Sequence, residues 1–544
     1  MSQRDSGHHH NRLNNPLIKG TLLLFLYSLL LNLPYLHLRE FQGEEGRRVI
    51  IAVDMLETGS WVVPHVEGTV YLNKPPLFNW LLAGMFKITG NISETTARML
   101  SVLTAFLCAL SLSLFFQRIA HVRDAWFILP GLIFLTFAEV MGKAIKAEID
   151  ITFTLFVTLS LITWFYLHEI REQHGPAWIA GLSLAGIGVL TKGIQAPLFF
   201  YGAVFPYLIY QKKTRRVLSI SHLSGLAAFL AVLSLWFVPL INQVGFHKIT
   251  DTWLSEILVR GEPLKESGVI KHLFEFPFLY LMAYMPWAPF MLLWIYRPLK
   301  DASPLLMSKK TASFALFSLL FSVPLYWVIP GAWIRYLLPV SGMLSILMAL
   351  PMISLLNHRM DEPVWYQRYI KTVALLLILL VLSTPLWGSR FKLLENPLPL
   401  FFIGGLLLTA ILLFFEKQTQ RKVILLLTAI LLGKVSWASV YFPYHQGHLS
   451  HYRNAAQEIN RLVPSSASLY DYGVDNPHIA FYLKRPIRLI NSLDNGMIPR
   501  NGFVLVKKDV SPGLDLKEFS HIGDIKARNI YLVIYQLETG GNNP

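Results

Sequence analysis

Residues 398–415 read LPLFFIGGLLLTAILLFF and contain no charged side chain. A helix of about 18 or more such residues is long enough to cross the hydrocarbon core of a bilayer. Comparable apolar runs recur along most of the chain and predict about thirteen transmembrane helices. The predicted spans are 18–38, 95–117, 125–143, 149–168, 177–190, 195–211, 218–242, 274–296, 313–330, 335–356, 370–388, 398–415 and 422–441.

The composition of the whole chain indicates the same class of protein. Hydrophobic residues make up 53% of the 544 residues and charged residues only 15%, whereas soluble proteins carry about 25% charge. The single cysteine, Cys108, excludes a disulfide scaffold. The predicted fold class is therefore a polytopic α-helical membrane protein. The net charge of +15 does not indicate a nucleic-acid partner, since basic cytoplasmic loops account for much of it.

The charges of the loops predict how the helices are oriented. With the N-terminus in the cytoplasm, the cytoplasmic segments hold twenty Lys and Arg residues, and the short loops on the opposite side hold six. Two longer segments on that opposite side, 39–94 and 243–273, add nine more. Because basic residues concentrate in cytoplasmic loops, this distribution favours a cytoplasmic N-terminus.

The sequence after residue 444 is polar and mixed, unlike the chain before it. It contains a helix-like stretch, HYRNAAQEINRLV, and three short β-like runs, SASLYDYG, FVLVKK and NIYLVIYQL. We therefore expect a transmembrane domain over 1–444 and a small α/β domain over 445–544. Thirteen crossings from a cytoplasmic N-terminus place this second domain on the outer, periplasmic side.

The densest group of charges on the outer side follows the first predicted span. Glu44, Glu45, Arg47 and Arg48 lie within five residues. On a helix, Glu44 shares a face with both arginines. The apolar run VIIAV follows directly and predicts an interfacial amphipathic helix over 46–58. The alternative interpretation of such a cluster is a solvated turn that neutralises itself.

Lys74 is the second outer residue that the sequence singles out. Two prolines follow it, and a proline keeps the preceding residue in an extended conformation. Lys74 is therefore predicted to stand in a stiff, non-helical segment just before the chain returns to the membrane. There it can hold a phosphate or, alternatively, extend to the membrane surface as an ordinary interfacial lysine.

Other charged or polar residues are predicted on the same side. In the run KAIKAEID, Lys143, Lys146 and Asp150 have the spacing of one helix face at the outer mouth of the bundle. Charges next to hydrocarbon are costly and tend to be functional, although each of these residues can also be a solvated rim residue. The further candidates are Lys192, Arg260, Arg335 and Tyr336.

Together these residues predict a ring of cations with a few carboxylates on one face of a helical bundle. The cations suit an anionic lipid headgroup, and a neighbouring carboxylate suits general-base catalysis on a hydroxyl or amine. The sequence contains no P-loop, no GxGxxG and no zinc-ligand spacing. Nucleotide chemistry is therefore unsupported, and the bond energy for an outer reaction would arrive on a lipid carrier.

Several of these stretches resemble a known family in the order in which they occur. They are GEEGRR from Gly43, MLETGSWVVP from Met55, YLNKPPLFNW from Tyr71, LTKG from Leu190 and RYLLP from Arg335. Over residues 40–340 the chain resembles the bacterial family 39 glycosyltransferases. This family includes the 4-amino-4-deoxy-L-arabinose transferase of lipid A and the protein O-mannosyltransferases.

The resemblance implies the GT-C membrane fold and a polyprenyl-phosphate sugar as donor, usually undecaprenyl phosphate, with inversion at the anomeric carbon. It implies a lipid or glycan acceptor, such as lipid A or another envelope glycolipid, in the bacterial inner membrane among membrane lipids. It makes Glu44 the candidate base, Glu45 its neighbour and Asp150 a second acid at the donor site. The expected donor-binding residues are Arg47, Arg48, Lys74, Lys146, Lys192, Arg260, Arg335 and Tyr336.

Asn73 departs from the family pattern, because aminoarabinose enzymes often have a glutamate there and some bind a metal with it. No cofactor is therefore expected, and a divalent metal is left open. Two rival functions also stay open. A flippase or transporter of a polyprenyl-linked lipid would place polar groups along the membrane midplane. A structural or sensor protein would leave the block from Glu44 to Trp80 unexplained.

Overall fold

Helices occur at each of the thirteen segments predicted to span the membrane. In eight cases the helix is long and apolar enough, by length and composition, to cross a membrane. Two more predicted spans are bent pairs of helices, which raise the number to ten within the described residues. The count of thirteen crossings therefore stays a prediction. The computed structural model describes residues 15–260, 266–296, 305–357, 361–391, 393, 397–490, 492–493, 498–499, 501–514 and 516–537.

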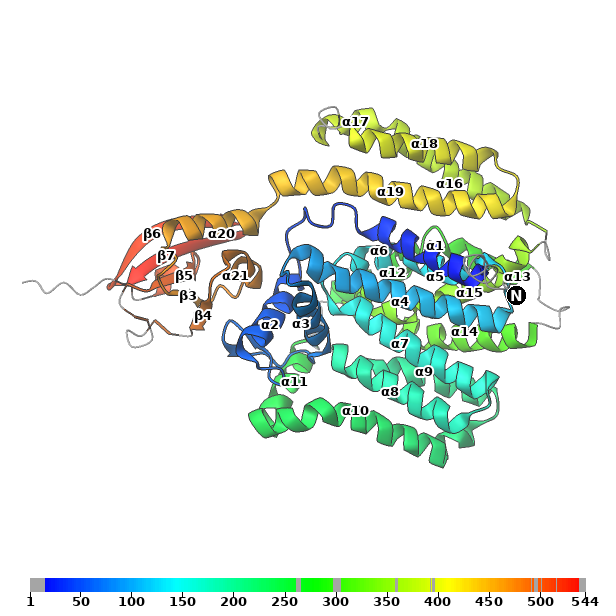
Figure 1. Cartoon of the computed structure of the whole chain (residues 1–544), viewed down its shortest axis with the longest axis horizontal. Coiled ribbons are helices and arrows are strands. Elements are labelled where there is room, and N and C mark those ends of the chain that lie inside the picture. Colours follow the sequence, from blue (N-terminus) through cyan, green and yellow to red (C-terminus); the bar gives the residue numbers. More distant parts are fainter. Residues whose placement is uncertain are drawn as a thin grey trace, which may run out of the picture.

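The main bundle is drawn in Figure 1, and two of its helices, α15 and α7, are largely buried along their apolar stretches. Helix α15 lies at its centre and packs against α4, α5 and α7. One continuous apolar core joins these helices to α8, α9 and α14. The bounds are α1 (Pro16–Asn32), α4 (Glu94–Ala120), α5 (Leu129–Leu135), α6 (Ala138–Ala144), α7 (Ile149–Phe165), α8 (His174–Lys192), α9 (Gln195–Tyr210), α10 (Ile220–Val244), α11 (Phe246–Arg260), α12 (Glu266–Ala283), α13 (Leu293–Tyr296), α14 (Leu305–Val328) and α15 (Leu338–Leu356).

Three helices form a separate layer along one side of the bundle (Figure 1). Helix α18 (Leu398–Phe415) packs between α16 (Val364–Leu382) and α19 (Thr419–His448), with the short α17 (Thr384–Gly388) between α16 and α18 in sequence. Helix α19 also contacts α1 and α15. Because α19 continues to His448, the polar C-terminal unit begins about four residues later than the predicted boundary at residue 444.

The C-terminal unit contains a five-stranded mixed sheet in the order β4-β3-β5-β7-β6. Strand β3 is parallel to both of its neighbours, and the pairs β5–β7 and β6–β7 are antiparallel. The helix-like stretch and the three β-like runs of the sequence coincide with α20, β3, β5 and β7. The bounds are α20 (His451–Leu462), β3 (Leu469–Tyr472), α21 (Pro477–Leu483), β4 (Ile487–Ile490), β5 (Phe503–Lys507), β6 (Phe519–Ala527) and β7 (Ile530–Leu537).

The segment between α1 and α4 lies at the same end of the bundle as this sheet (Figure 1). It contains α2 (Glu45–Thr58), a small hairpin of β1 (His65–Val66) and β2 (Thr69–Val70), and α3 (Leu77–Thr89). Helix α2 matches the amphipathic helix predicted over 46–58, and it ends at a glycine with φ +74°, as helices commonly do.

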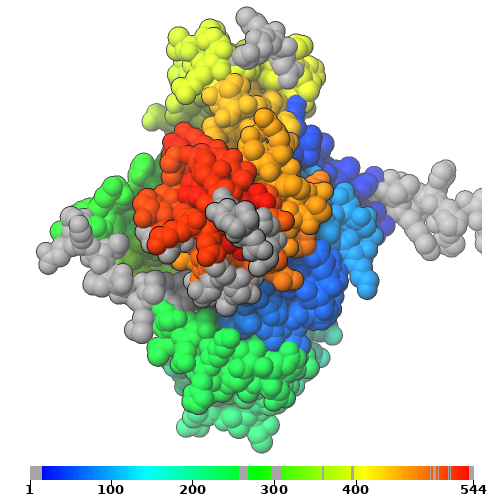
Figure 2. Space-filling view, turned by 90° about the vertical axis from the view of Figure 1, so that its left-hand side faces the viewer, coloured from blue at the N-terminus to red at the C-terminus, as the bar shows by residue number. Residues whose placement is uncertain are grey.

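The C-terminal unit lies against this segment. Figure 2 looks onto this end of the molecule and shows the orange and red C-terminal residues in front, with the blue N-terminal segment beside them. Helix α21 packs on α2. The contact requires a glycine at position 46, since an added Cβ would lie 3.0 Å from backbone and side-chain atoms of His478.

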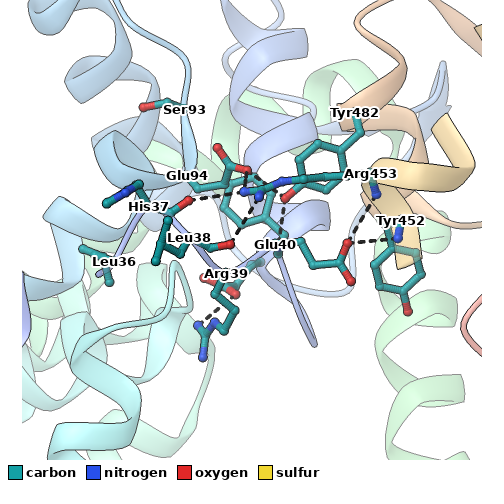
Figure 3. A network of polar contacts seen from close by, with 12 residues as sticks. Leu36, His37, Leu38, Arg39, Glu40, Ser93, Glu94, Tyr452, Arg453 and Tyr482 are labelled. Carbon is teal, nitrogen blue, oxygen red and sulfur yellow. Dashed lines mark hydrogen bonds and ion pairs between the residues drawn. The ribbon is translucent and has the colours of Figure 1, made fainter. Parts of the chain in front are cut away.

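A network of polar contacts fastens the two units together (Figure 3). The carboxylate of Glu40 accepts hydrogen bonds from three backbone N–H groups at the start of α20. The guanidinium of Arg453 donates to the carbonyl oxygens of His37 and Leu38 and pairs with Glu94. The network therefore holds residues 36–40, which lead directly to α2.

Candidate functional site

A cavity of about 190 Å³ lies where the start of α2 meets the ends of several bundle helices. Segments that lie almost 300 residues apart in sequence form its walls, which shows that the cavity is a product of the fold and not of one loop. Eight of the eleven predicted site residues line it. The lining residues are Glu44, Arg47, Arg48, Tyr71, Asn73, Lys74, Glu148, Ile149, Asp150, Lys192, Arg335 and Tyr336.

The charges at the start of α2 have the arrangement that their spacing predicts. Glu44 occupies the position just before the helix. Its carboxylate lies 3.3 Å from a guanidinium nitrogen of Arg47 and 3.4 Å from one of Arg48, one turn further along. The Glu44 side chain is 47% exposed, so a substrate in the cavity can reach it.

Arg48 is the least satisfied charged group of the cavity. Its side chain is only 2% exposed, and its Nε and Nη1 have no hydrogen-bond acceptor among the described residues. Only Nη2 is engaged, with Glu44 and with the hydroxyl of Tyr71 at 3.3 Å. Arg48 therefore adds a positive charge to the wall of the cavity, while its two unpartnered nitrogens are covered by protein.

Asp150 lies at the opposite wall, in the first turn of α7. Its carboxylate is held between Lys192, at 2.6 Å, and Lys143, at 3.1 Å. Lys143 also pairs with Glu148. The prediction that Lys143, Lys146 and Asp150 share one helix face is wrong, because residues 145–148 separate α6 from α7. The break instead folds Lys143 back onto Asp150.

Glu45 has an environment unlike that of its neighbour Glu44. Its carboxylate is fully buried and accepts hydrogen bonds from Arg98 at 2.7 and 3.0 Å, from Arg39 at 3.3 Å and from the backbone N–H of Ala147 at 2.9 Å. Burial favours the neutral acid, but the two guanidinium groups outweigh it and lower the pKa of Glu45 to about 2. Glu45 is not among the residues that line the cavity.

Arg98 is the residue that sequence reasoning missed at this position. Besides Glu45, it donates to the backbone carbonyls of Leu36, Arg39 and Glu40 at 2.8 to 3.1 Å. It thereby fixes the chain that leads into Glu44. No local signal identifies it, since Arg98 lies on α4, more than fifty residues from Glu45.

The other predicted cations differ in position. Lys74 stands in a non-helical segment before α3, as predicted, and its ammonium group donates to the carbonyl of Asn73 at 2.9 Å. The guanidinium of Arg335 lies 5.7 Å from the ring centre of Tyr336. Lys146 does not line the cavity, and burial lowers its pKa. The side chain of Arg260 lies outside the described residues.

Tyr71, Asn73 and Glu148 line the cavity but were not predicted as site residues. All three lie in stretches that the sequence singled out, YLNKPPLFNW and KAIKAEID. Gly43 lies close to Glu148 and must be a glycine, since its φ is +65° and an added Cβ would lie 2.9 Å from the Glu148 carboxylate. Among the described residues, no group of three or more His, Cys, Asp or Glu side chains is arranged to hold a metal ion.

Comparisons with known proteins show which proteins this chain is similar to. The family model of dolichyl-phosphate-mannose-protein mannosyltransferases matches residues 73–240. An undecaprenyl phosphate-alpha-4-amino-4-deoxy-L-arabinose arabinosyl transferase of Pseudomonas savastanoi pv. phaseolicola is 29% identical over 231 residues, or 41% of this chain and 42% of that protein. An uncharacterized protein of Aquifex aeolicus is 25% identical over 474 residues, 86% of each chain. The chain therefore matches less than half the length of the arabinosyl transferase.

The fold is shared over a much greater length than the sequence. The crystal structure of ArnT from Cupriavidus metallidurans bound to undecaprenyl phosphate superposes with a TM-score of 0.67 at 17% identity, covering 96% of this chain and 98% of that one. The expected GT-C fold and the family resemblance are thus confirmed. The chain is a polytopic membrane protein with the fold of ArnT, and it resembles the GT-C glycosyltransferases that include ArnT and the O-mannosyltransferases.

Proposed function

We propose that the protein is a membrane glycosyltransferase that moves a sugar from a polyprenyl phosphate, such as undecaprenyl phosphate, to an acceptor on the periplasmic side. The observation that carries the proposal is the cavity in which the unsatisfied guanidinium of Arg48 lies beside the exposed carboxylate of Glu44. The similarity to an arabinosyl transferase and the ArnT fold support the same activity.

The cavity has the charge that a phosphate donor needs. Five basic side chains line it against three carboxylates. Asp150 neutralises Lys192, but no carboxylate among the described residues lies within ion-pair distance of Arg335. In the proposal, Arg48, Lys74 and Arg335 supply the positive charge that holds the phosphate. Donors held in place in this way stabilise the negative charge that develops on a leaving phosphate.

Glu44 is the proposed general base. Its carboxylate takes the proton from an acceptor hydroxyl while the oxygen attacks the anomeric carbon of the sugar. The bond between that carbon and the phosphate oxygen breaks, the new glycosidic bond forms with inversion, and polyprenyl phosphate leaves. The guanidinium groups of Arg47 and Arg48, at 3.3 and 3.4 Å, hold the Glu44 carboxylate at the wall of the cavity.

Glu45 and Asp150 are proposed to act by positioning other groups. Glu45 fixes the start of α2 through Arg98 and Arg39, and Asp150 fixes Lys143 and Lys192. Lys146 and Arg260 have no assigned contact with the donor. The cytoplasmic N-terminus and the periplasmic C-terminal unit are part of the proposal and rest on the distribution of basic residues between the loops.

A transfer assay tests the function. Purified full-length protein is incubated with undecaprenyl phosphate carrying different sugars and with a membrane-lipid extract, and release of undecaprenyl phosphate is measured. Glu44→Gln keeps the shape of the side chain but removes the base, so we expect the rate to fall about 100-fold to 10,000-fold. Donor affinity should change little.

Glu57→Gln is the matched control, because Glu57 is an exposed carboxylate on the same helix and lies outside the cavity. It should keep the wild-type rate. Release that survives Glu44→Gln would refute the assignment of the base. Donor binding without release, across a wide panel of sugars, would contradict the transferase and favour a flippase.

A further inference from the structure

The chain just before Glu44 is held by residues from the far end of the sequence. The backbone N–H of Phe41 donates to the hydroxyl of Tyr482, on α21, at 2.8 Å. The ring of Phe41 is fully buried and packs edge-on against Phe481, with ring centres 4.8 Å apart. The hydroxyl of Tyr482 in turn donates to Glu94 at 3.0 Å (Figure 3). Helix α21 therefore fixes both the backbone and the side chain of Phe41.

Gln42 is held by a histidine of α19. Its side-chain amide nitrogen lies 2.6 Å from Nε2 of His445, which is 3% exposed and lies in the last turn of this helix. An amide nitrogen can only donate, so the ring nitrogen is the acceptor. The backbone N–H of Gln42 donates to Glu45 at 3.0 Å. Gln42 thus ties the start of α2 to the helix that leads into the C-terminal unit.

His478 reaches the chain on both sides of Glu44. It lies in the first turn of α21 and packs against Gly46, where an added Cβ would be 3.0 Å from its backbone and its ring. Its imidazole also lies beside the backbone of Gly43. None of the described residues that line the basic cavity comes from α19 or α21. These two helices therefore hold the chain around Glu44 from outside the cavity.

Gly43 makes such support important. Its φ is +65°, and a glycine gives the backbone more freedom than any other residue. The Glu44 side chain that follows is 47% exposed, so packing alone does not fix it. A general base must lie within hydrogen-bonding distance of the proton that it takes, and a misplacement of about 1 Å can slow a reaction about 100-fold. The position of the Glu44 carboxylate therefore depends on how its neighbours in the chain are held.

We propose that Tyr482, His445 and His478 are positioning residues that set the place of the Glu44 carboxylate. The proposal rests on the proposed function, in which Glu44 is the base. It gives the C-terminal unit a direct part in the transfer, because α21 and the end of α19 fix residues 41–43 without lining the basic cavity. The alternative is that these contacts hold the fold together and do nothing for the reaction.

Two variants each remove one of these hydrogen bonds and keep the bulk of the side chain. Tyr482→Phe takes the acceptor from the N–H of Phe41, and His445→Leu takes it from the amide of Gln42. In the transfer assay with full-length protein, we expect the rate at saturating donor to fall about tenfold to 100-fold. Affinity for undecaprenyl phosphate should stay within about twofold, since neither residue lines the cavity.

Two further variants are the controls. His445→Gln keeps an acceptor near the place of Nε2 and should retain most of the rate, whereas a loss as large as that of His445→Leu would contradict the role of this hydrogen bond. Tyr531→Phe removes the hydroxyl of an exposed tyrosine on β7 of the same unit and should keep the wild-type rate.

A double-mutant cycle separates positioning from a purely structural role. If the contact acts through Glu44, adding Tyr482→Phe to Glu44→Gln should slow the reaction no further, because no base is left to displace. We expect the double variant to match Glu44→Gln within about twofold. A further loss of about tenfold would show that the contact acts through stability or through another group, and would overturn the proposal.

Hydrogen exchange tests the same contacts without turnover. Exchange of the backbone amides in residues 41–46 should rise about tenfold in Tyr482→Phe and in His445→Leu and stay unchanged in Tyr531→Phe. Unchanged exchange in the first two variants overturns the inference. If Glu44→Gln is slow but both variants keep the wild-type rate, the inference is overturned while the proposed function stands. If exchange rises and Glu44→Gln keeps the wild-type rate, the assignment of the base fails, and the holding of this segment stands.

Discussion

Two cavities lie at the end of the molecule that carries the C-terminal unit: the basic cavity described above, and a neighbouring one of about 400 Å³ that is lined by Arg47, Val66, Glu67, Thr69, Tyr71, Asn73, Asp475 and Leu489. They share Arg47, Tyr71 and Asn73 and differ in the balance of their charges. The first has five basic and three acidic side chains, and the second has one basic and two acidic side chains. Arg47 belongs to both, pairing with Glu44 on one side and with Asp475 on the other. The comparison teaches that an excess of basic side chains distinguishes the cavity proposed to hold the carrier phosphate from its neighbour.

The two cavities also differ in the parts of the chain that build them. All lining residues of the first cavity come from the segment between α1 and α4 and from the bundle helices. The second cavity needs Asp475 and Leu489 from the C-terminal unit. Glu45, through its ion pairs with Arg98 and Arg39, holds the start of α2, which contributes residues to both cavities. Changes to these ion pairs should therefore alter the shape of both cavities. Changes to the contact with the C-terminal unit should alter the second cavity more.

The largest expected effect comes from Glu45→Gln, which removes the ion pairs that hold the start of α2. The variant leaves Arg98 and Arg39 buried without their carboxylate. Breaking a buried ion pair in this way costs about 3–5 kcal/mol. We expect a clearly lower melting temperature, measured by scanning fluorimetry in detergent, together with weaker binding of undecaprenyl phosphate.

The same variant has a signature in its pH dependence. The pKa of Glu45 is about 2, below its ordinary value of 4.5, so its ionised form stabilises the folded state. This stabilisation, about 3 kcal/mol, is present above about pH 4.5 and is lost as the pH falls toward 2. Glu45→Gln should flatten the loss of stability in that window. An unchanged acid profile would show that Glu45 is not held as described.

The next largest effect is expected from Arg48→Met, because Arg48 lines the first cavity and not the second. Methionine fills the buried space but offers no donors to a phosphate. Loss of charged hydrogen bonds should weaken undecaprenyl phosphate binding about tenfold to 100-fold. Glu57→Gln, outside the cavity, should keep the wild-type affinity. An unchanged affinity of Arg48→Met would contradict the role of Arg48.

The smallest effect is expected from Arg453→Ala, which weakens the contact with the C-terminal unit. The variant removes the pair with Glu94 and two hydrogen bonds to residues 37–38. For partly exposed contacts we expect a cost of about 1–2 kcal/mol. Hydrogen exchange in residues 36–44 should rise, and undecaprenyl phosphate affinity should fall by less than in Arg48→Met. Unchanged hydrogen exchange would contradict the role of Arg453 in holding this segment.

The sequence predicts those features that depend on local periodicity. Apolar runs locate the helices, and the spacing of Glu44, Arg47 and Arg48 predicts the pairs at the start of α2. The Lys74 segment is predicted because proline acts on its immediate neighbour.

The features that the sequence does not predict depend on distant contacts. Glu44 and Glu45 are adjacent and chemically alike, but Arg98, on another helix, pairs with Glu45. The helical spacing from Lys143 to Asp150 is misleading, because the chain breaks at 145–148 and the lysine folds back. Glu67 is buried where the C-terminal unit, some 400 residues later, contacts the hairpin.

The central claim is that the basic cavity, and not its acidic neighbour, holds the carrier phosphate. The most direct measurement is a structure of the protein with undecaprenyl phosphate, determined by cryo-electron microscopy in a lipid nanodisc. We predict that the phosphate lies in the basic cavity beside Glu44 and contacts the guanidinium of Arg48. A phosphate bound against Glu67 and Asp475, or one without contact to Arg48, would contradict the account.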